Sequence, residues 1–144
     1  MPIVDRLVMF GIVVKDMAKA KAFYVDKLGL KVMTDYRQDD DHWWVSVRAA
    51  KDDRPGDVPW WRSLAAPDGG VTMTLTTFHE NAKPGKVSLY FATSDVASAH
   101  KDLSGKGLKV SEIGDDLFGP GSGVKWFNLE DPDGNLVHFV QEQT

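Results

Sequence analysis

The sequence contains no cysteine, no long hydrophobic run and no large excess of one charge. The absence of cysteine excludes disulfides, thiolate zinc sites and a cysteine nucleophile, and it fits a reducing compartment. The longest apolar stretch, residues 7–14, is far shorter than the roughly 20 residues of a transmembrane helix. Asp5 and Arg6 precede this stretch and their charges cancel, whereas a secretory signal begins with positive charge. We therefore expect a cytoplasmic protein that does not enter the membrane.

The charged residues point to the same kind of protein. The chain has 17 Lys and Arg against 21 Asp and Glu, which gives a net charge of −4. A negative net charge disfavours nucleic acid or an anionic membrane surface as the partner. The 144 residues are 42% hydrophobic and 26% charged, as in ordinary globular proteins. We expect residues 1–144 to form a single folded domain.

Two stretches of the chain follow the same plan. In each, a predicted strand (residues 7–14 and 87–93) is followed by an aspartate that can cap a helix, Asp16 and Asp95. The tetrapeptide Gly-Leu-Lys-Val then occurs at residues 29–32 and again at 107–110. Each stretch ends in further predicted strands, which lie over residues 30–33, 43–47 and 71–78 in the first, and over 124–130 and 135–140 in the second. The repeat predicts an α+β protein of two βαβββ modules, about residues 5–80 and 85–142.

The two helices and the last turn carry local signals of their own. After Asp16, apolar residues recur at helical spacing, and Gly29 stands where a glycine ends a helix. Residues 131–134, Asp-Pro-Asp-Gly, predict a tight turn between the last two strands. The residues expected on the buried helix faces are Met17, Ala20, Tyr24 and Leu28 in the first helix, and Val96, Ala99 and Leu103 in the second.

Three short motifs occur together in this chain: residues 14–17 (Val-Lys-Asp-Met), residues 23–24 (Phe-Tyr) followed by 28–29 (Leu-Gly), and residues 131–135 (Asp-Pro-Asp-Gly-Asn). With this combination the chain resembles the vicinal oxygen chelate superfamily of glyoxalases, bleomycin-resistance proteins and dioxygenases. The resemblance implies that the two modules pair into an open, cup-shaped mixed β-sheet, and that the protein is a homodimer. In that family the cup holds a divalent metal in the enzymes and a ligand in the binding proteins. One fold hosts many functions, so the motifs do not choose between these.

The resemblance places the family's metal ligands at four positions, which are occupied here by Met9, Thr74, Ser88 and His138. A thioether is a soft ligand, and hydroxyl groups bind Zn²⁺, Ni²⁺, Fe²⁺ or Mn²⁺ weakly. Of the four, only His138 suits such a metal. We therefore expect no metal site and no cofactor, and a divalent metal at an atypical site is the alternative.

Residues of matching parity on the same strands should face the cup, because strand side chains alternate between faces. These residues include Tyr90, Trp126 and Asn128. His138 has two open roles: it packs in the sheet, or it acts as a general base near neutral pH. No carboxylate is obviously placed to orient it, and the nearest candidate is Glu130, across the same hairpin. The resulting cavity has aromatic walls, several hydroxyl groups, one amide and one imidazole but no clustered charge, which fits an aromatic or planar small molecule.

A long segment rich in proline and glycine, residues 49–70, contains the tryptophan pair Trp60 and Trp61. Long loops commonly serve as lids or binding loops, and a dimer contact is the alternative. We include both tryptophans among the expected ligand-binding residues because their flat rings can close over a planar ligand.

Together these observations lead to one function hypothesis and two alternatives. We expect a metal-independent small-molecule-binding protein that sequesters a drug or a metabolite. The first alternative is a metal-dependent enzyme of the glyoxalase or dioxygenase type with an atypical metal site. The second is a metal-free acid–base enzyme that uses His138.

Overall fold

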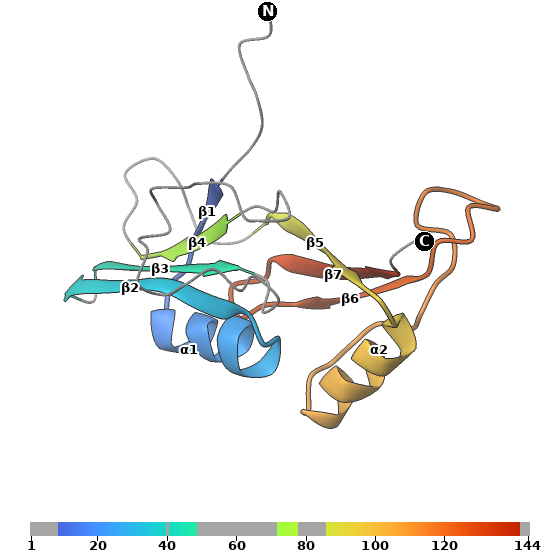
Figure 1. Cartoon of the computed structure of the whole chain (residues 1–144), viewed down its shortest axis with the longest axis horizontal. Coiled ribbons are helices and arrows are strands. Elements are labelled where there is room, and N and C mark those ends of the chain that lie inside the picture. The colour runs from blue at the N-terminus through green and yellow to red at the C-terminus, as the bar shows by residue number, and fades with distance from the viewer. Residues whose placement is uncertain (1–8, 40, 49–71, 78–85, 142–144) are drawn as a thin grey trace, which may run out of the picture. The chain divides into compact units, whose positions relative to one another are not determined.

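The computed structural model describes residues 9–39, 41–48, 72–77 and 86–141. Contacts divide the chain into two compact units, Met1–Pro84 and Gly85–Thr144, and each unit has its own sheet and its own helix (Figure 1). The segment 49–70, with Trp60 and Trp61, lies outside the described residues. The predicted α+β class is confirmed, because each unit combines a mixed sheet with a helix.

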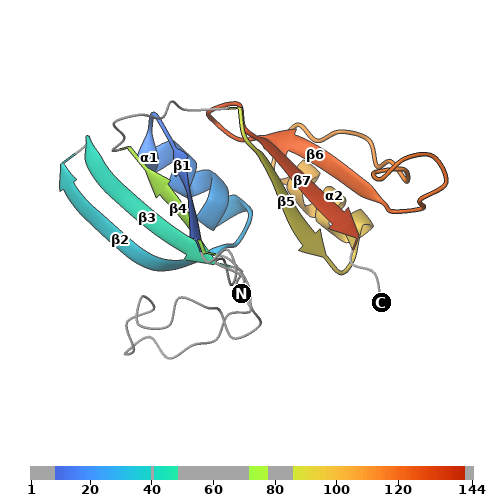
Figure 2. The same ribbon diagram turned by 90° about the horizontal axis from the view of Figure 1, so that it is seen from above.

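The first unit has a four-stranded sheet in the order β1-β4-β3-β2 (Figure 2). β1 runs parallel to β4, and the other neighbours are antiparallel. The segment predicted as a strand over 30–33 is longer than expected and reaches Asp39. The elements are β1 (Met9–Val13), α1 (Met17–Lys21), the π-helical turn η1 (Ala22–Lys27), β2 (Lys31–Asp39), β3 (His42–Arg48) and β4 (Thr72–Thr76).

The first helix begins as the sequence predicts and continues differently. The Asp16 carboxylate accepts a hydrogen bond from the Lys19 N–H at 3.1 Å, which confirms the N-cap. After Lys21 the helix widens into η1, where the Leu28 N–H donates to the Phe23 carbonyl at 3.0 Å. Phe23 and Tyr24 are both buried here, at the i+3 and i+4 positions from the buried Ala20, whereas only Tyr24 was expected on the buried face. The core of this unit lies between this helix and one face of the sheet, where Ile12, Val45, Val47, Met73 and Leu75 are buried.

The second unit has a three-stranded sheet in the order β5-β7-β6, with β5 parallel and β6 antiparallel to the central β7. Its elements are β5 (Ser88–Thr93), α2 (Val96–Gly105), β6 (Trp126–Glu130) and β7 (Leu136–Gln141). The Asp95 carboxylate caps α2 by accepting from the Ser98 N–H at 3.1 Å. As predicted, Val96 and Leu103 are buried, and Ala99 is half-buried.

The strand that the repeat predicts directly after α2 is reduced to a single bridge between Gly114 and Trp126. Upstream of that bridge, the Ser111 N–H donates to the Asn128 carbonyl at 2.9 Å. The Asn128 N–H donates in turn to the hydroxyl of Ser111, also at 2.9 Å. A side chain thus takes the place of a backbone carbonyl, so the regular ladder does not form along this edge of β6.

The turn at residues 131–134 forms as predicted and is fixed by a buried polar network. Gly134 adopts a positive φ of 86°, and the Asp131 carboxylate accepts from the backbone N–H groups of Asp133 and Asn135, both at 2.8 Å. The Asn135 side chain is fully buried, donates to Asp131 and accepts from the Val87 N–H at 3.1 Å. This asparagine therefore ties the β6–β7 hairpin to the start of β5. Within the described ranges, no helix is both long enough and apolar enough to cross a membrane.

Candidate binding site

The predicted site residues of the second unit lie together on one face of its sheet. In the strand register Tyr90 of β5 lies opposite His138 of β7, and His138 lies opposite Asn128 of β6. The three side chains therefore form one row across the sheet. Phe127, the neighbour of Asn128, packs its ring edge-on against His100 of α2, with ring centroids 5.1 Å apart. The row accordingly lies on the face that α2 does not cover.

His138 lies beneath a parallel aromatic ring. Its imidazole and the phenol ring of Tyr90 are stacked with centroids 4.4 Å apart and planes within 8° of parallel. Tyr90 is 61% exposed, whereas His138 is only 7% exposed. Burial lowers the pKa of His138 below its ordinary value, because an imidazolium loses hydration there. The imidazole is therefore neutral at neutral pH, and its partner ring presents an open aromatic surface.

Glu130, the candidate for orienting His138, forms no hydrogen bond with Nδ1 of that histidine. Glu130 is exposed and lies opposite Leu136, one row away from His138 on the same face. The Nδ1 atom of His138 is buried and has no hydrogen-bond partner among the described residues. A general base normally has a second group that fixes its tautomer. This histidine has no such group in the described part of the chain.

Trp126 lies in the next row of the same face, with its ring centroid 5.8 Å from that of His138 and the planes 49° apart. Its Nε1 atom is buried and unpartnered within the described residues. Gly114 packs directly against it: a Cβ added at this glycine would lie 2.9 Å from Nε1. Gly114 also exchanges two backbone hydrogen bonds with Trp126, of 2.9 and 3.0 Å. Gly114 therefore allows the indole to lie flat over the bridge.

A groove adjoins this row at the edge of β6. It has a volume of about 380 Å³ and is lined by residues 108–111 together with Asn128, Glu130 and Leu136. Ser88, another predicted site residue, is exposed at the start of β5 and lies opposite Leu136 on the same face. Ligand pockets of proteins commonly enclose 300–1,000 Å³, so a groove of this size suits a small molecule.

The first unit places Met9 and Thr74 on one face of its own sheet. Met9 is 43% exposed and lies opposite Thr72, and Thr74 lies opposite Gly11 two residues further along. The hydroxyl groups of Thr74 and Ser46 are hydrogen-bonded, with their oxygens 2.9 Å apart. The Thr74 oxygen thus has a partner within its own sheet.

Sequence reasoning missed a buried cation on this face. Arg48 of β3 is 2% exposed, and its Nε donates to the hydroxyl of Thr72 at 2.5 Å. The alternation of Ser46 and Arg48 with the buried Val45 and Val47 was a usable signal, because it places both polar residues on one face. Gly114 was also missed, and no local motif marks it.

The tryptophan pair of β3 has partners inside its unit. The Trp43 Nε1–H donates to Asp35 at 2.7 Å, and the guanidinium of Arg37 lies 4.5 Å from the centre of the Trp43 rings. Trp44 stacks on Tyr36 with centroids 4.4 Å apart. The two tryptophans point to opposite faces of β3, and each has contacts within this unit.

Among the described residues, no three His, Asp or Glu side chains lie close enough together to hold a metal ion. A family model described as the Glyoxalase/Bleomycin resistance protein/Dioxygenase superfamily matches residues 6–139. The chain belongs to this superfamily. The resemblance found in the sequence motifs is thereby confirmed.

Solved structures of the superfamily match nearly the whole chain. TnmS3, an antibiotic binding protein from Streptomyces sp. CB03234, is 21% identical with a TM-score of 0.74, and the match covers 99% of this chain and 100% of that chain. A superfamily member from Sphaerobacter thermophilus DSM 20745 is 24% identical with a TM-score of 0.67, covering 98% and 100%. At these identities the likeness establishes the fold alone. No curated protein sequence matches this chain.

Proposed function

We propose that this superfamily member is a metal-independent protein that binds and sequesters a planar aromatic small molecule. The observation that carries the proposal is the parallel stack of Tyr90 on His138, in which a largely exposed aromatic ring lies on a face not covered by α2. Trp126 and the groove beside Asn128 extend the same face. Flat aromatic surfaces of this kind bind planar ligands by stacking.

The chemistry of the donor groups supports metal independence. At the positions where the superfamily's enzymes hold their metal, Met9 offers a thioether, and Thr74 and Ser88 offer hydroxyl groups. The Thr74 hydroxyl is already hydrogen-bonded to Ser46. His138 is the single good ligand of the four, whereas catalytic zinc sites use three protein ligands. The antibiotic-binding function of TnmS3, a structure of the same fold, is consistent with sequestration.

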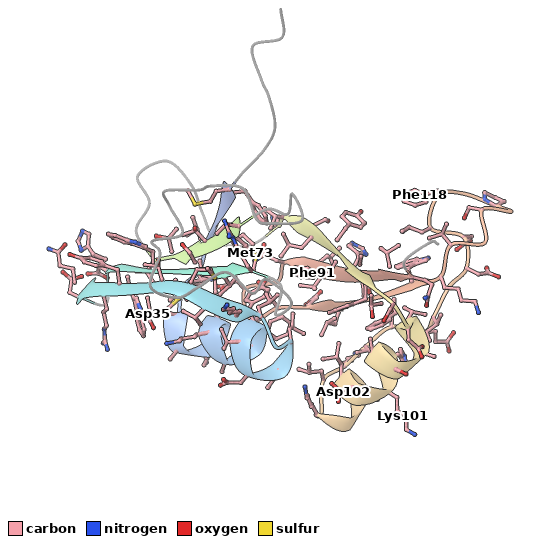
Figure 3. All side chains as sticks on the ribbon, in the orientation of Figure 1. Asp35, Met73, Phe91, Lys101, Asp102 and Phe118 are labelled. Atoms are coloured by element: carbon pink, nitrogen blue, oxygen red, sulfur yellow. The ribbon has the colours of Figure 1, made fainter. Side chains whose placement is uncertain are left out.

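A tryptophan-fluorescence titration against planar antibiotics and polycyclic aromatic metabolites tests the proposal. A true ligand should quench or shift the emission saturably. Trp126→Ala should then weaken its affinity by at least about 30-fold, since truncating a central aromatic residue costs at least ~2 kcal/mol. Phe118→Ala is the matched control, because Phe118 is 76% exposed in the loop between α2 and β6 (Figure 3). Equal affinities of the two variants would contradict the proposed site.

Elemental analysis of protein purified without chelator or added metal distinguishes the enzyme alternative. We expect far less than one equivalent of zinc, nickel, iron or manganese. A near-stoichiometric metal content would instead favour a glyoxalase- or dioxygenase-type enzyme with an atypical site. A reaction catalysed without metal and abolished in His138→Ala would favour the acid–base alternative. We further propose that the protein is cytoplasmic, in keeping with its cysteine-free sequence, and homodimeric, as the resemblance to the superfamily implies.

A further inference from the structure

Two buried polar atoms of this face, Nε1 of Trp126 and Nδ1 of His138, have no hydrogen-bond partner among the described residues, and only Nδ1 can be an acceptor. The side chain is 7% exposed, Nδ1 itself is shielded from solvent, and no described residue forms a hydrogen bond with it. Buried polar groups are nearly always paired in proteins, because an unpaired one has lost water without compensation. The atom therefore marks a place where a partner from outside the described residues fits.

The charge and the tautomer of His138 define what that partner must supply. Burial keeps the imidazole neutral, so one ring nitrogen carries a proton and the other is an acceptor. A proton on the shielded Nδ1 would be a donor that no described residue accepts, whereas Nε2 is not among the buried unpartnered atoms. We therefore assign the proton to Nε2 and the free lone pair to Nδ1. The missing partner must be a hydrogen-bond donor.

The neighbouring side chains do not supply such a donor. The Tyr90 ring is parallel to the imidazole, so it covers the ring face and lies outside the plane in which Nδ1 accepts. The Trp126 Nε1–H lies against Gly114. Asn128, opposite His138 in the register, forms no hydrogen bond with Nδ1. Glu130, the charged side chain of this face nearest in the register, is exposed and lies opposite Leu136.

We propose that Nδ1 of His138 is the polar anchor of the site and accepts a hydrogen bond from a hydroxyl group on the ligand's aromatic ring, which makes hydroxylated planar aromatics the preferred ligand class. This inference rests on the proposed function and specifies its ligand. The aromatic part follows from the rings of Tyr90 and Trp126, and the hydroxyl part follows from the unpaired acceptor. Because Nδ1 is shielded from solvent, side chains around it must shift as the ligand's hydroxyl group reaches it, and such side-chain changes are common on binding.

Two matched probes test the anchor directly: 2-naphthol carries the hydroxyl, and 2-methoxynaphthalene has the same ring without the donor. Fluorescence titration of the full chain should give 2-naphthol the tighter binding, by about 2- to 12-fold, as expected for one neutral hydrogen bond. In His138→Phe, which retains a ring without the acceptor, the two probes should bind equally. In His138→Asn, which keeps an amide oxygen near the place of Nδ1, part of the preference should return.

A matched control and a spectroscopic readout separate recognition from a structural role. His42→Phe, at a histidine bonded to Asp39 in the other unit, should leave the preference unchanged. Nitrogen NMR of the free protein should show Nδ1 of His138 as the unprotonated nitrogen, and 2-naphthol should shift this signal whereas 2-methoxynaphthalene should not. Thermal unfolding of each variant confirms that the fold is retained.

The outcomes are distinct. Binding of both probes with equal affinity to the unaltered protein would overturn the anchor and leave the aromatic-binding function standing, with a water molecule as the partner of Nδ1. A preference for 2-naphthol that persists in His138→Phe would also overturn the assignment of Nδ1 as the anchor. Absence of binding for both probes up to about 1 mM, the limit of weak association, would count against both the anchor and the proposed function.

Discussion

Gly114 illustrates how a residue without functional groups can control the site. A Cβ at this position would lie 2.9 Å from Nε1 of Trp126, closer than side chains normally approach. We therefore predict that Gly114→Ala tilts the indole and weakens binding of a planar ligand, while the two backbone hydrogen bonds to Trp126 keep the bridge. Fluorescence emission and ligand titration measure both effects. Gly105→Ala, at the end of α2 with open space around its Cβ, is the control. Unaltered emission and affinity in Gly114→Ala would show that the contact does not hold the ring.

His138 should make the stability of the protein depend on pH. Burial lowers its pKa in the folded state, so below the ordinary value of 6.5 the unfolded chain binds protons more readily than the folded one. The stabilising contribution is complete above pH 6.5 and is lost as the pH falls from there toward the folded-state pKa. Denaturant unfolding at a series of pH values below 6.5 should show this loss of stability in the unaltered protein and in His42→Gln. His138→Gln should lack it, and an identical pH profile in this variant would refute the assignment.

At the scale of elements, the β6–β7 hairpin depends on the side chain of Asn135. This residue is fully buried and joins the Asp131 carboxylate to the Val87 N–H. Asn135→Ala removes the side-chain hydrogen bonds to the Asp131 carboxylate and from the Val87 N–H, and we predict that the free energy of unfolding falls by about 2–3 kcal/mol, as for lost hydrogen bonds to a charged group. Glu112→Ala, an exposed position in the same unit, should change it by less than about 0.5 kcal/mol. Urea denaturation measures both changes, and equal values would contradict the role of Asn135.

The elements also show which parts of the fold the sequence could predict. The helix caps Asp16 and Asp95 and the turn at residues 131–134 act through neighbours a few positions away. Local sequence patterns were therefore enough to predict them. The widening of the first helix into η1 could not be predicted, because the apolar spacing after Asp16 is that of an ordinary α-helix. The loss of a regular strand after α2 also escaped prediction, since it depends on Ser111 meeting Asn128 across 17 residues of chain.

In the candidate site, too, some features could be predicted from the sequence and others could not. The family resemblance located His138, strand parity added Tyr90 and Asn128 to the same face, and the register aligns the three in a single row. Parity does not give ring orientation, so the parallel stack of Tyr90 and the unpaired Nδ1 needed the three-dimensional arrangement. The close approach of Gly114 to Trp126 likewise depends on two strands meeting, which no local motif encodes.

At the scale of the whole molecule, each unit leaves large apolar side chains exposed on the sheet face opposite its helix. In the first unit this applies to Met9, which is 43% exposed, and in the second to Tyr90 and Leu136, which are 61% and 37% exposed. Apolar residues that share a face favour association with another surface. This is the structural reason to expect that two copies of the chain associate.

We predict that the protein in solution is a homodimer with twice the chain mass of 16.0 kDa. Light scattering coupled to size exclusion at micromolar concentration measures this mass directly. Leu136→Lys places a charge on the exposed sheet face, opposite Glu130, with which it can pair, so the unit itself should still fold. Because a charge on a buried contact costs far more than one on a surface, the variant should shift toward the monomer. Phe118→Lys, at the most exposed of the large hydrophobic residues described but in a loop, should remain dimeric. A stable monomer of the unaltered chain would refute the dimer, and a dimer unaffected by Leu136→Lys would move the contact to another surface.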